Sequence, residues 1–168
     1  MIFLKEEKVG FGFAIGDGVT GGRNTEATVD NKGGSFRVMW RTDNGGAPYF
    51  HPYVYYKDMT GQYGTDFQSS RYNNIVANQW YRIRLTINVN TGSTSTNGVG
   101  KMEVSTNGGT SYTTVWNKTN IRWSGATTTN LKVKTLYFST FRGGSDSTWN
   151  GSNGTQDIFF DNLSWKTL

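Results

Sequence analysis

Apolar and polar residues alternate over several short stretches of this sequence, and turns rich in glycine and asparagine separate them. The clearest stretch is residues 80–89, where Tyr81, Ile83, Leu85, Ile87 and Val89 take every second position. Side chains two apart on a strand point to the same face of a sheet, so this stretch predicts a strand with one apolar face. No segment of ten or more residues shows the 3.6-residue period of a helix. The alternation therefore predicts an all-β fold.

The predicted strands are distributed along the whole chain. We expect them at residues 34–41, 47–56, 80–89, 100–106, 111–117, 131–141 and 157–165. Asp43-Asn-Gly-Gly46 and Asn107-Gly-Gly-Thr110 have the composition of hairpin turns. With 168 residues and no internal repeat or linker, the chain predicts one domain over residues 1–168. We expect two antiparallel sheets packed as a sandwich, a β-jelly roll with a concave groove.

Charge and composition restrict the partners. Seventeen Lys and Arg against 12 Asp and Glu give a net charge of +5, which favours a polyanion. The basic residues form no run, and no nucleic-acid-binding motif is present, so we expect no nucleic-acid partner. No stretch is apolar over the ~20 residues that a membrane span needs. Without cysteine and with one histidine, we expect no metal site and no cofactor. Calcium bound by aspartates and backbone carbonyls is a minor alternative, because no Asp-x-Asp-x-Asp-Gly loop is present.

The cellular location is predicted from composition alone. Neutral polar residues dominate the sequence, as in secreted carbohydrate-active β proteins, so we expect a secreted or extracellular protein. Residues 1–7 are too short and too charged for a signal peptide. Either the protein stays inside the cell, or this sequence begins after a removed leader.

Two neighbouring predicted strands, at 34–41 and 47–56, combine an apolar face with an unusual polar one. The apolar face would carry Phe36, Val38, Trp40, Phe50, Val54 and Tyr56. The opposite face would carry Ser35, Arg37, Met39, Arg41, Tyr49, His51, Tyr53 and Tyr55. Pro52 interrupts the second strand and predicts a bend or an edge there. Guanidinium groups beside a row of phenols indicate that this face of the sheet carries the functional site.

The residues on this face suit proton transfer next to a carboxylate better than hydrolysis. A Ser-His-Asp triad would have to use His51, and no Gly-x-Ser-x-Gly elbow is present. Acidic residues are scattered, with no paired-carboxylate strand motif. A polysaccharide lyase instead needs cations to neutralise a uronate carboxylate, a base and an acid. Arg37, Tyr53 and Tyr55 on adjacent strands meet that demand.

The same residues carry a resemblance to a known family. Gly34-Ser-Phe-Arg-Val-Met-Trp-Arg41 and Tyr53-Val-Tyr55 resemble the core motifs of polysaccharide lyase family 14, the alginate and glucuronan lyases. The opening Lys8-Val-Gly-Phe-Gly12 resembles its lysine-glycine segment. Residues 137–146 and Phe160-Asp-Asn-Leu163 resemble its C-terminal signature. The resemblance implies a β-jelly roll and β-elimination chemistry on a 4-linked uronate polymer such as alginate or glucuronan.

Residue roles follow from the matched motifs. The resemblance implies catalytic roles for Lys8, Arg37, Tyr53 and Tyr55, and substrate binding by Ser35. We expect further substrate contacts from His51, Arg41, Arg82, Arg84 and Arg142. Either tyrosine can be the acid or the base, and mannuronate, guluronate and glucuronate polymers all remain candidates. We expect an anionic polysaccharide as the partner and a monomeric protein. The alternative is a non-catalytic carbohydrate-binding module for acidic polysaccharides.

Overall fold

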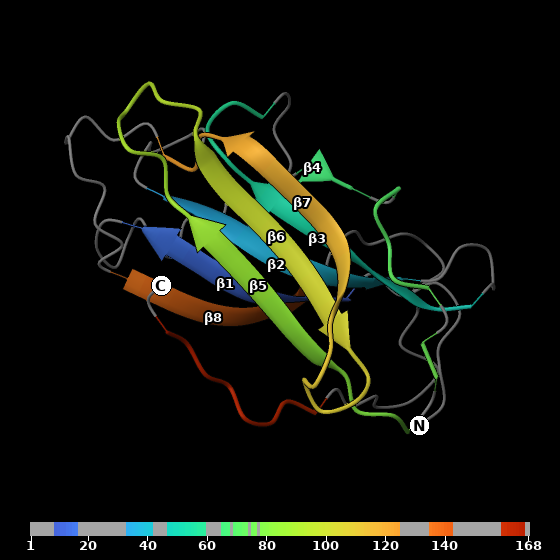
Figure 1. Cartoon of the computed structure of the whole chain (residues 1–168). Coiled ribbons are helices and arrows are strands. Elements are labelled where there is room, and N and C mark those ends of the chain that lie inside the picture. The colour runs from blue at the N-terminus through green and yellow to red at the C-terminus, as the bar shows by residue number, and fades with distance from the viewer. Residues whose placement is uncertain are drawn as a thin grey trace.

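Two antiparallel sheets form the computed structural model, which describes residues 9–16, 33–41, 47–59, 65–67, 69–73, 75–76, 78–124, 135–142 and 159–166. The large sheet has the strand order β4-β3-β2-β1-β8 and the small sheet the order β5-β6-β7. The strands are β1 (Val9–Gly16), β2 (Gly33–Arg41), β3 (Tyr49–Tyr55), β4 (Thr65–Asp66), β5 (Arg82–Asn88), β6 (Gly98–Ser105), β7 (Thr113–Ile121) and β8 (Thr135–Arg142). Figure 1 shows the small sheet in front of the large one. The predicted all-β sandwich is confirmed.

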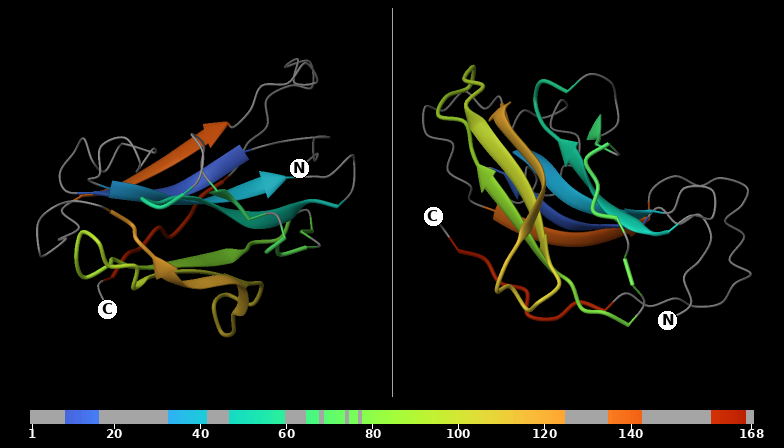
Figure 2. Two further views of the ribbon diagram at one scale, coloured as in Figure 1. Left: turned by 90° about the horizontal axis from the view of Figure 1, so that it is seen from above. Right: turned by 45° about the vertical axis from the view of Figure 1, so that its right-hand side comes forward.

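The core lies between the two sheets, which Figure 2 shows edge-on as two layers. The large sheet contributes Phe36, Val38, Phe50 and Val54, and the small sheet faces them with Met102, Val104 and Trp116. The Phe36 ring lies 5.2 Å from the Trp116 ring and 6.0 Å from that of Trp123, measured between centroids. Full burial of side chains this size supplies most of the hydrophobic driving force for folding.

Asn90 joins the ends of β5 and β7 across the small sheet. Its side-chain oxygen accepts a hydrogen bond of 2.8 Å from the Trp123 amide, and its side-chain nitrogen donates to the Ser124 carbonyl at 3.0 Å. The Trp123 indole donates to the Val99 carbonyl at 3.0 Å. A buried amide is tolerated when it is hydrogen-bonded in this way. These bonds fix the fully buried Trp123 ring under β2.

Gly12 allows β1 to pair closely with the centre of its neighbouring strand β2. It pairs with Arg37, and a Cβ atom added to it would lie 2.5 Å from the Phe36 carbonyl oxygen and 2.8 Å from the Arg37 Cα. Its φ of 149° is also one that side-chain-bearing residues rarely adopt. Glycine at this position therefore permits the close approach of β1 and β2.

Pro52 neither ends β3 nor bends it out of the sheet. It pairs with Val38, and β3 continues on both sides of it. Its carbonyl accepts a hydrogen bond of 3.2 Å from the Phe67 amide, just beyond β4. On an antiparallel strand the amide and carbonyl of one residue face the same neighbour. The missing proline donor therefore faces the end of the two-residue β4, and the ladder with β2 stays intact.

The predicted last strand, 157–165, is wrong over the residues that the structure describes. Residues 159–166 belong to no strand, and Asn162 has a φ of 54°. A left-handed residue in the middle of the segment interrupts the extended backbone that a ladder needs. Phe160 instead packs on the large sheet, with its ring 5.1 Å from Phe11 and 5.4 Å from Phe138. Figure 1 draws this segment in red beside β8 and β5.

Candidate active site

The polar face predicted from residues 34–56 forms on the outer side of the large sheet, away from the small sheet. The register pairs Ser35 with Tyr55, Arg37 with Tyr53, Met39 with His51, and Arg41 with Tyr49. The intervening side chains, among them Phe36 and Val54, point into the core. The alternation therefore places serine, arginine, histidine and tyrosines together. We call Ser35, Arg37, Tyr53 and Tyr55 the Arg–Tyr cluster.

Arg37 and Ser35 are neighbours along β2 and are hydrogen-bonded to each other. The guanidinium Nη1 of Arg37 donates to the Ser35 Oγ at 3.1 Å. The Arg37 side chain is only 5% exposed and that of Ser35 is fully buried. A guanidinium held in a region of low dielectric attracts a carboxylate more strongly than one in water. The pair therefore offers an oriented cationic donor on this face.

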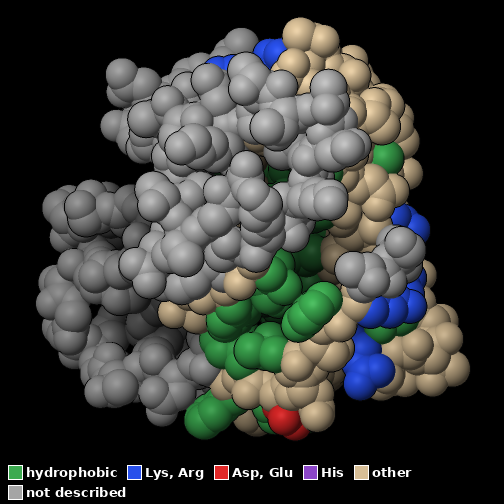
Figure 3. All heavy atoms as spheres, turned by 90° about the vertical axis from the view of Figure 1, so that its left-hand side faces the viewer, with side chains coloured by type: hydrophobic (Ala, Val, Ile, Leu, Met, Phe, Trp, Pro, Cys, Tyr) green, Lys and Arg blue, Asp and Glu red, His purple; other side chains and the backbone are tan. Residues whose placement is uncertain are grey.

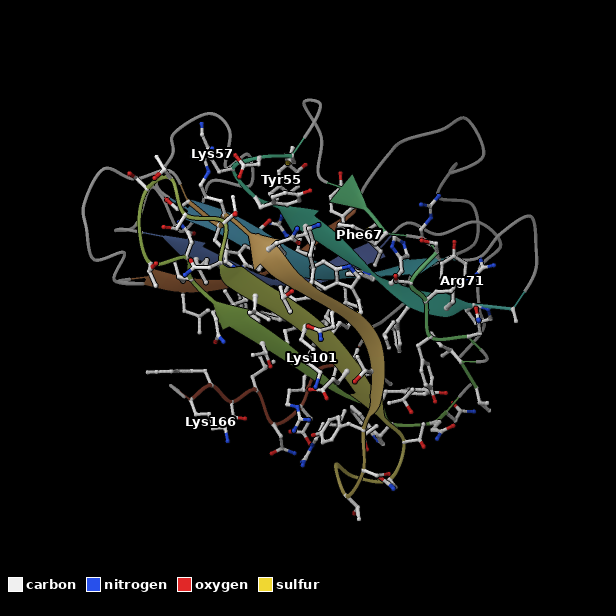
Figure 4. All side chains as sticks on the ribbon, turned by 45° about the horizontal axis from the view of Figure 1, so that its top comes forward. Tyr55, Lys57, Phe67, Arg71, Lys101 and Lys166 are labelled. Carbon is white, nitrogen blue, oxygen red and sulfur yellow. The ribbon has the colours of Figure 1, made fainter. Side chains whose placement is uncertain are left out.

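Tyr53 and Tyr55 form the second half of the Arg–Tyr cluster. Their hydroxyl oxygens are 3.5 Å apart, and their rings meet edge to face at 5.6 Å. Tyr55 is 8% exposed and packs on Met59, whereas Tyr53 is half-buried. Each phenol can donate or accept a proton, so two adjacent hydroxyls suit acid–base chemistry. Figure 4 labels Tyr55 on β3, at the side of the sheet where β4 begins.

His51 lies on the same face but is enclosed. Its side chain is fully buried, its ring lies 5.6 Å from that of Tyr49, and its Nδ1 is 3.1 Å from the Pro52 carbonyl oxygen. A carbonyl only accepts, so Nδ1 carries the proton in this bond. Tyr49 also lies under the guanidinium of Arg71, which is 4.9 Å from the ring centroid. His51 thus belongs to an aromatic and cationic layer next to the Arg–Tyr cluster.

The structure does not bring Arg82 and Arg84 to this face. They lie on β5 and are exposed, while Ile83 and Leu85 between them pack on the core. Their side chains therefore stand on the outer side of the small sheet, across the whole sandwich from Arg37. Arg84 is bound to Glu103 at 2.7 Å. The sequence showed the alternation of β5 but not which sheet the strand would join.

Three other residues were predicted to contact substrate or to act in catalysis: Arg41, Arg142 and Lys8. Arg41 ends β2 on the same face as Arg37, opposite Tyr49. Arg142 ends β8, and its backbone pairs with Val9, which in turn pairs with Trp40. Lys8 lies outside the described residues. The structure also shows a strand that the sequence pattern missed, β4, whose backbone pairs with Tyr53 from the side opposite Arg37. A two-residue strand has no alternation by which it could be recognised.

The described residues contain neither a group of metal ligands nor a membrane-spanning helix. Within those ranges no three His, Cys, Asp or Glu side chains are grouped so that they could hold a metal ion. The same part of the chain contains no helix with the length and apolarity of a membrane span.

Comparison with known proteins gives consistent matches. The family model described as polysaccharide lyase 14 matches residues 10–163. The structure of the alginate lyase Aly36B is 35% identical, has a TM-score of 0.61, and is matched over 86% of this chain and 55% of its own. A double mutant of that lyase in complex with an alginate tetrasaccharide is 28% identical, with a TM-score of 0.58, over 86% of this chain and 62% of its own.

A more distant structure shares the fold. The marine alginate lyase from Aplysia kurodai is 24% identical, has a TM-score of 0.60, and is matched over 84% of this chain and 56% of its own. This chain therefore spans little more than half the length of the solved lyases that it matches. No curated protein sequence matches it.

Proposed function

Because the chain belongs to polysaccharide lyase family 14, we propose that it cleaves a 4-linked uronate polymer by β-elimination. The observation that carries this proposal is the register of β2 and β3, which sets the hydrogen-bonded Ser35–Arg37 pair directly opposite Tyr55 and Tyr53. A cationic donor and two phenols on neighbouring strands are the groups that this reaction requires.

The reaction needs the carboxylate of the uronate to be neutralised first. A base then takes the proton from the carbon next to that carboxylate, and the electron pair forms a double bond to the adjacent carbon. The bond from that adjacent carbon to the glycosidic oxygen breaks, and an acid gives the oxygen a proton. Arg37, oriented by Ser35, neutralises the carboxylate, and preorganised donors of this kind stabilise the developing negative charge. Lys8 is the second cation of the proposal.

Tyr53 and Tyr55 supply the acid and the base. Their hydroxyl groups are 3.5 Å apart, so one phenol can take a proton from the sugar while the other gives a proton to the leaving oxygen. Tyr53 is the more accessible of the two and pairs with Arg37 in the register. Tyr53 is therefore the better candidate for the group that contacts the sugar.

Alginate is the substrate that we favour within the uronate polymers. Two solved relatives that share 28% and 35% of their residues with this chain are forms of an alginate lyase, one with an alginate tetrasaccharide bound. The net charge of +5 supports any polyanionic chain, glucuronan included. A polymer too large to cross a membrane meets its enzyme outside the cell, so an extracellular location is part of the same proposal.

A non-catalytic module that binds acidic polysaccharides is the second candidate. The observation that favours it is burial, because Ser35, Arg37 and Tyr55 are each less than a tenth exposed. Side chains so enclosed suit a structural layer under a binding surface as well as a reaction centre. This candidate predicts binding to the polymer without formation of any unsaturated product.

The test is a panel of polymannuronate, polyguluronate, glucuronan and a neutral glucan, followed by the ultraviolet absorbance of unsaturated uronates. We expect absorbance to rise with at least one acidic polymer and to stay flat with the glucan. Retention of the protein on an acidic polymer, with no absorbance change on any member of the panel, would instead support the binding module.

A further inference from the structure

The outer face of the small sheet carries an exposed row that the Arg–Tyr cluster does not use. Along β5, Arg82 and Arg84 face solvent, while Ile83 and Leu85 pack on the core. Trp80 lies two residues before Arg82, the first residue of the strand, and 66% of its surface is exposed. Tyr81, which follows it, packs on Phe50 with ring centroids 5.6 Å apart. An indole and two guanidinium groups therefore take every second position from residue 80 to residue 84, at the start of β5.

Neighbouring residues of the small sheet hold this row in place. The Arg84 guanidinium lies 3.9 Å from the centroid of the Tyr112 ring and donates to Glu103 at 2.7 Å. Lys101, the next outward residue on β6, also binds Glu103 at 2.7 Å. The cation–π contact and the ion pairs fix Arg84 in one orientation before any ligand arrives. We call Trp80, Arg82, Arg84, Lys101 and Tyr112 the β5 surface.

The β5 surface keeps an excess of positive charge. Three cations, Arg82, Arg84 and Lys101, stand against one carboxylate, Glu103, which leaves two positive charges. The hydrogen bond from Arg84, with that from Lys101, lowers the pKa of Glu103 below its ordinary value, so this carboxylate is charged at neutral pH. Figure 3 shows Lys and Arg side chains gathered on the side of the molecule that the small sheet forms.

We propose that the β5 surface is a second binding site, for a stretch of anionic polysaccharide, on the face opposite the Arg–Tyr cluster. Trp80 offers a flat ring against a sugar ring, and the cations are spaced along a strand to meet successive carboxylates. The choice of a uronate polymer rests on the proposed function, whereas the site itself rests on the β5 surface. In Figure 4, Lys101 and Tyr55 mark the two sheets that carry the two sites.

Native electrophoresis through gels containing alginate tests the site, because a bound polymer retards the protein. The test variant is the double substitution Trp80→Ala and Arg82→Gln, which leaves the Arg84–Glu103 pair intact. The matched control is Trp165→Ala with Lys166→Gln, which also removes one exposed indole and one cation. We expect the test variant to bind alginate on the order of tenfold more weakly and the control to behave as wild type. Arg82→Gln alone provides a milder variant that keeps the indole.

The outcomes separate this inference from the proposed function. Equal retardation of the test variant, the control and the wild type would overturn the β5 surface, whether or not the wild type has lyase activity. Weaker retardation of the test variant alone supports the surface, and absence of lyase activity in the wild type would then count only against the proposed function. Retardation in a neutral glucan gel as strong as in alginate would overturn the anionic specificity. Added salt should reduce the retardation in alginate, since exposed charges are screened.

Discussion

Ser35 is one of the residues that orient Arg37. It is fully buried, and its hydroxyl oxygen accepts from the guanidinium at 3.1 Å. An arginine side chain has several rotatable bonds and loses conformational entropy when it is fixed. A buried hydrogen-bond acceptor fixes it during folding, so this entropy is not lost again when a ligand binds. In the proposed reaction, the fixed orientation of the Arg37 side chain would contribute to the rate.

Replacing Ser35 by Ala should therefore lower kcat/KM on alginate by about 10- to 150-fold, because a lost hydrogen bond to a charged group costs about 1.5–3 kcal/mol. Steady-state kinetics measure the change. Ser105→Ala is the control, since Ser105 is equally enclosed but lies on the small sheet and donates to Asn107 at 2.8 Å. Equal losses of activity in both variants would mean that Ser35 acts only through stability.

Glu103 makes one contribution to stability that depends on pH. Its pKa is lowered chiefly by the hydrogen bond from Arg84 and further by Lys101. A carboxyl whose folded pKa is depressed stabilises the fold above its unfolded pKa, and this stabilisation is lost as pH falls through the folded value. Only the folded form has the two cations beside the carboxylate.

The melting temperature of wild type should thus exceed that of Glu103→Gln at neutral pH, and the difference should shrink as the pH falls below about 4. Thermal melts followed by circular dichroism between pH 7 and pH 3 measure it. A difference that stays constant over that range would contradict the pairing of Glu103 with Arg84 and Lys101.

At the scale of elements, Phe160 attaches the C-terminal segment to the large sheet. Its ring meets Phe11 and Phe138, which lie on β1 and β8, and 37% of its surface is exposed. The neighbouring Phe159 is 70% exposed. The C-terminal segment therefore packs on β1 and β8, the two strands of the large sheet that lie farthest from β4.

Phe160→Ala should lower the free energy of unfolding by about 1–3 kcal/mol, less than for a fully buried ring, because part of the side chain is in water. Phe159→Ala is the matched control and should change it by less than about 0.5 kcal/mol. Denaturant unfolding of the three proteins gives both numbers. Equal losses in the two variants would mean that the segment is not held by the Phe160 ring.

Much of the sandwich could be predicted from alternation, because a period of two fixes the face of each side chain on a strand. That is why Arg37 and Tyr53 were expected on one face and were found paired. The sheet that a strand joins is decided by contacts far along the chain, so the same alternation could not place Arg82 and Arg84. The predicted last strand was wrong because Asn162 takes a left-handed conformation that no hydrophobic pattern reveals.

For the molecule as a whole, the sandwich separates two polar surfaces by one core. The outer side of the large sheet carries the Arg–Tyr cluster, and the outer side of the small sheet carries the β5 surface. Two sites on opposite faces cannot bind the same few sugars, so they would engage different stretches of polymer. Such an arrangement raises the local concentration of substrate at the first site.

The central claim, that Tyr53 and Tyr55 move protons in a β-elimination, is tested most directly by removing their hydroxyl groups. The measurement is the rate of unsaturated-uronate absorbance on alginate for Tyr53→Phe, Tyr55→Phe and the control Tyr81→Phe, whose hydroxyl is bonded to Val76 and Gln79 in the segment before β5. We expect at least one of the first two variants to lose about 10²-fold or more in kcat while still binding alginate, and the control to keep its rate. Activity near wild type in both Tyr53→Phe and Tyr55→Phe would contradict the account.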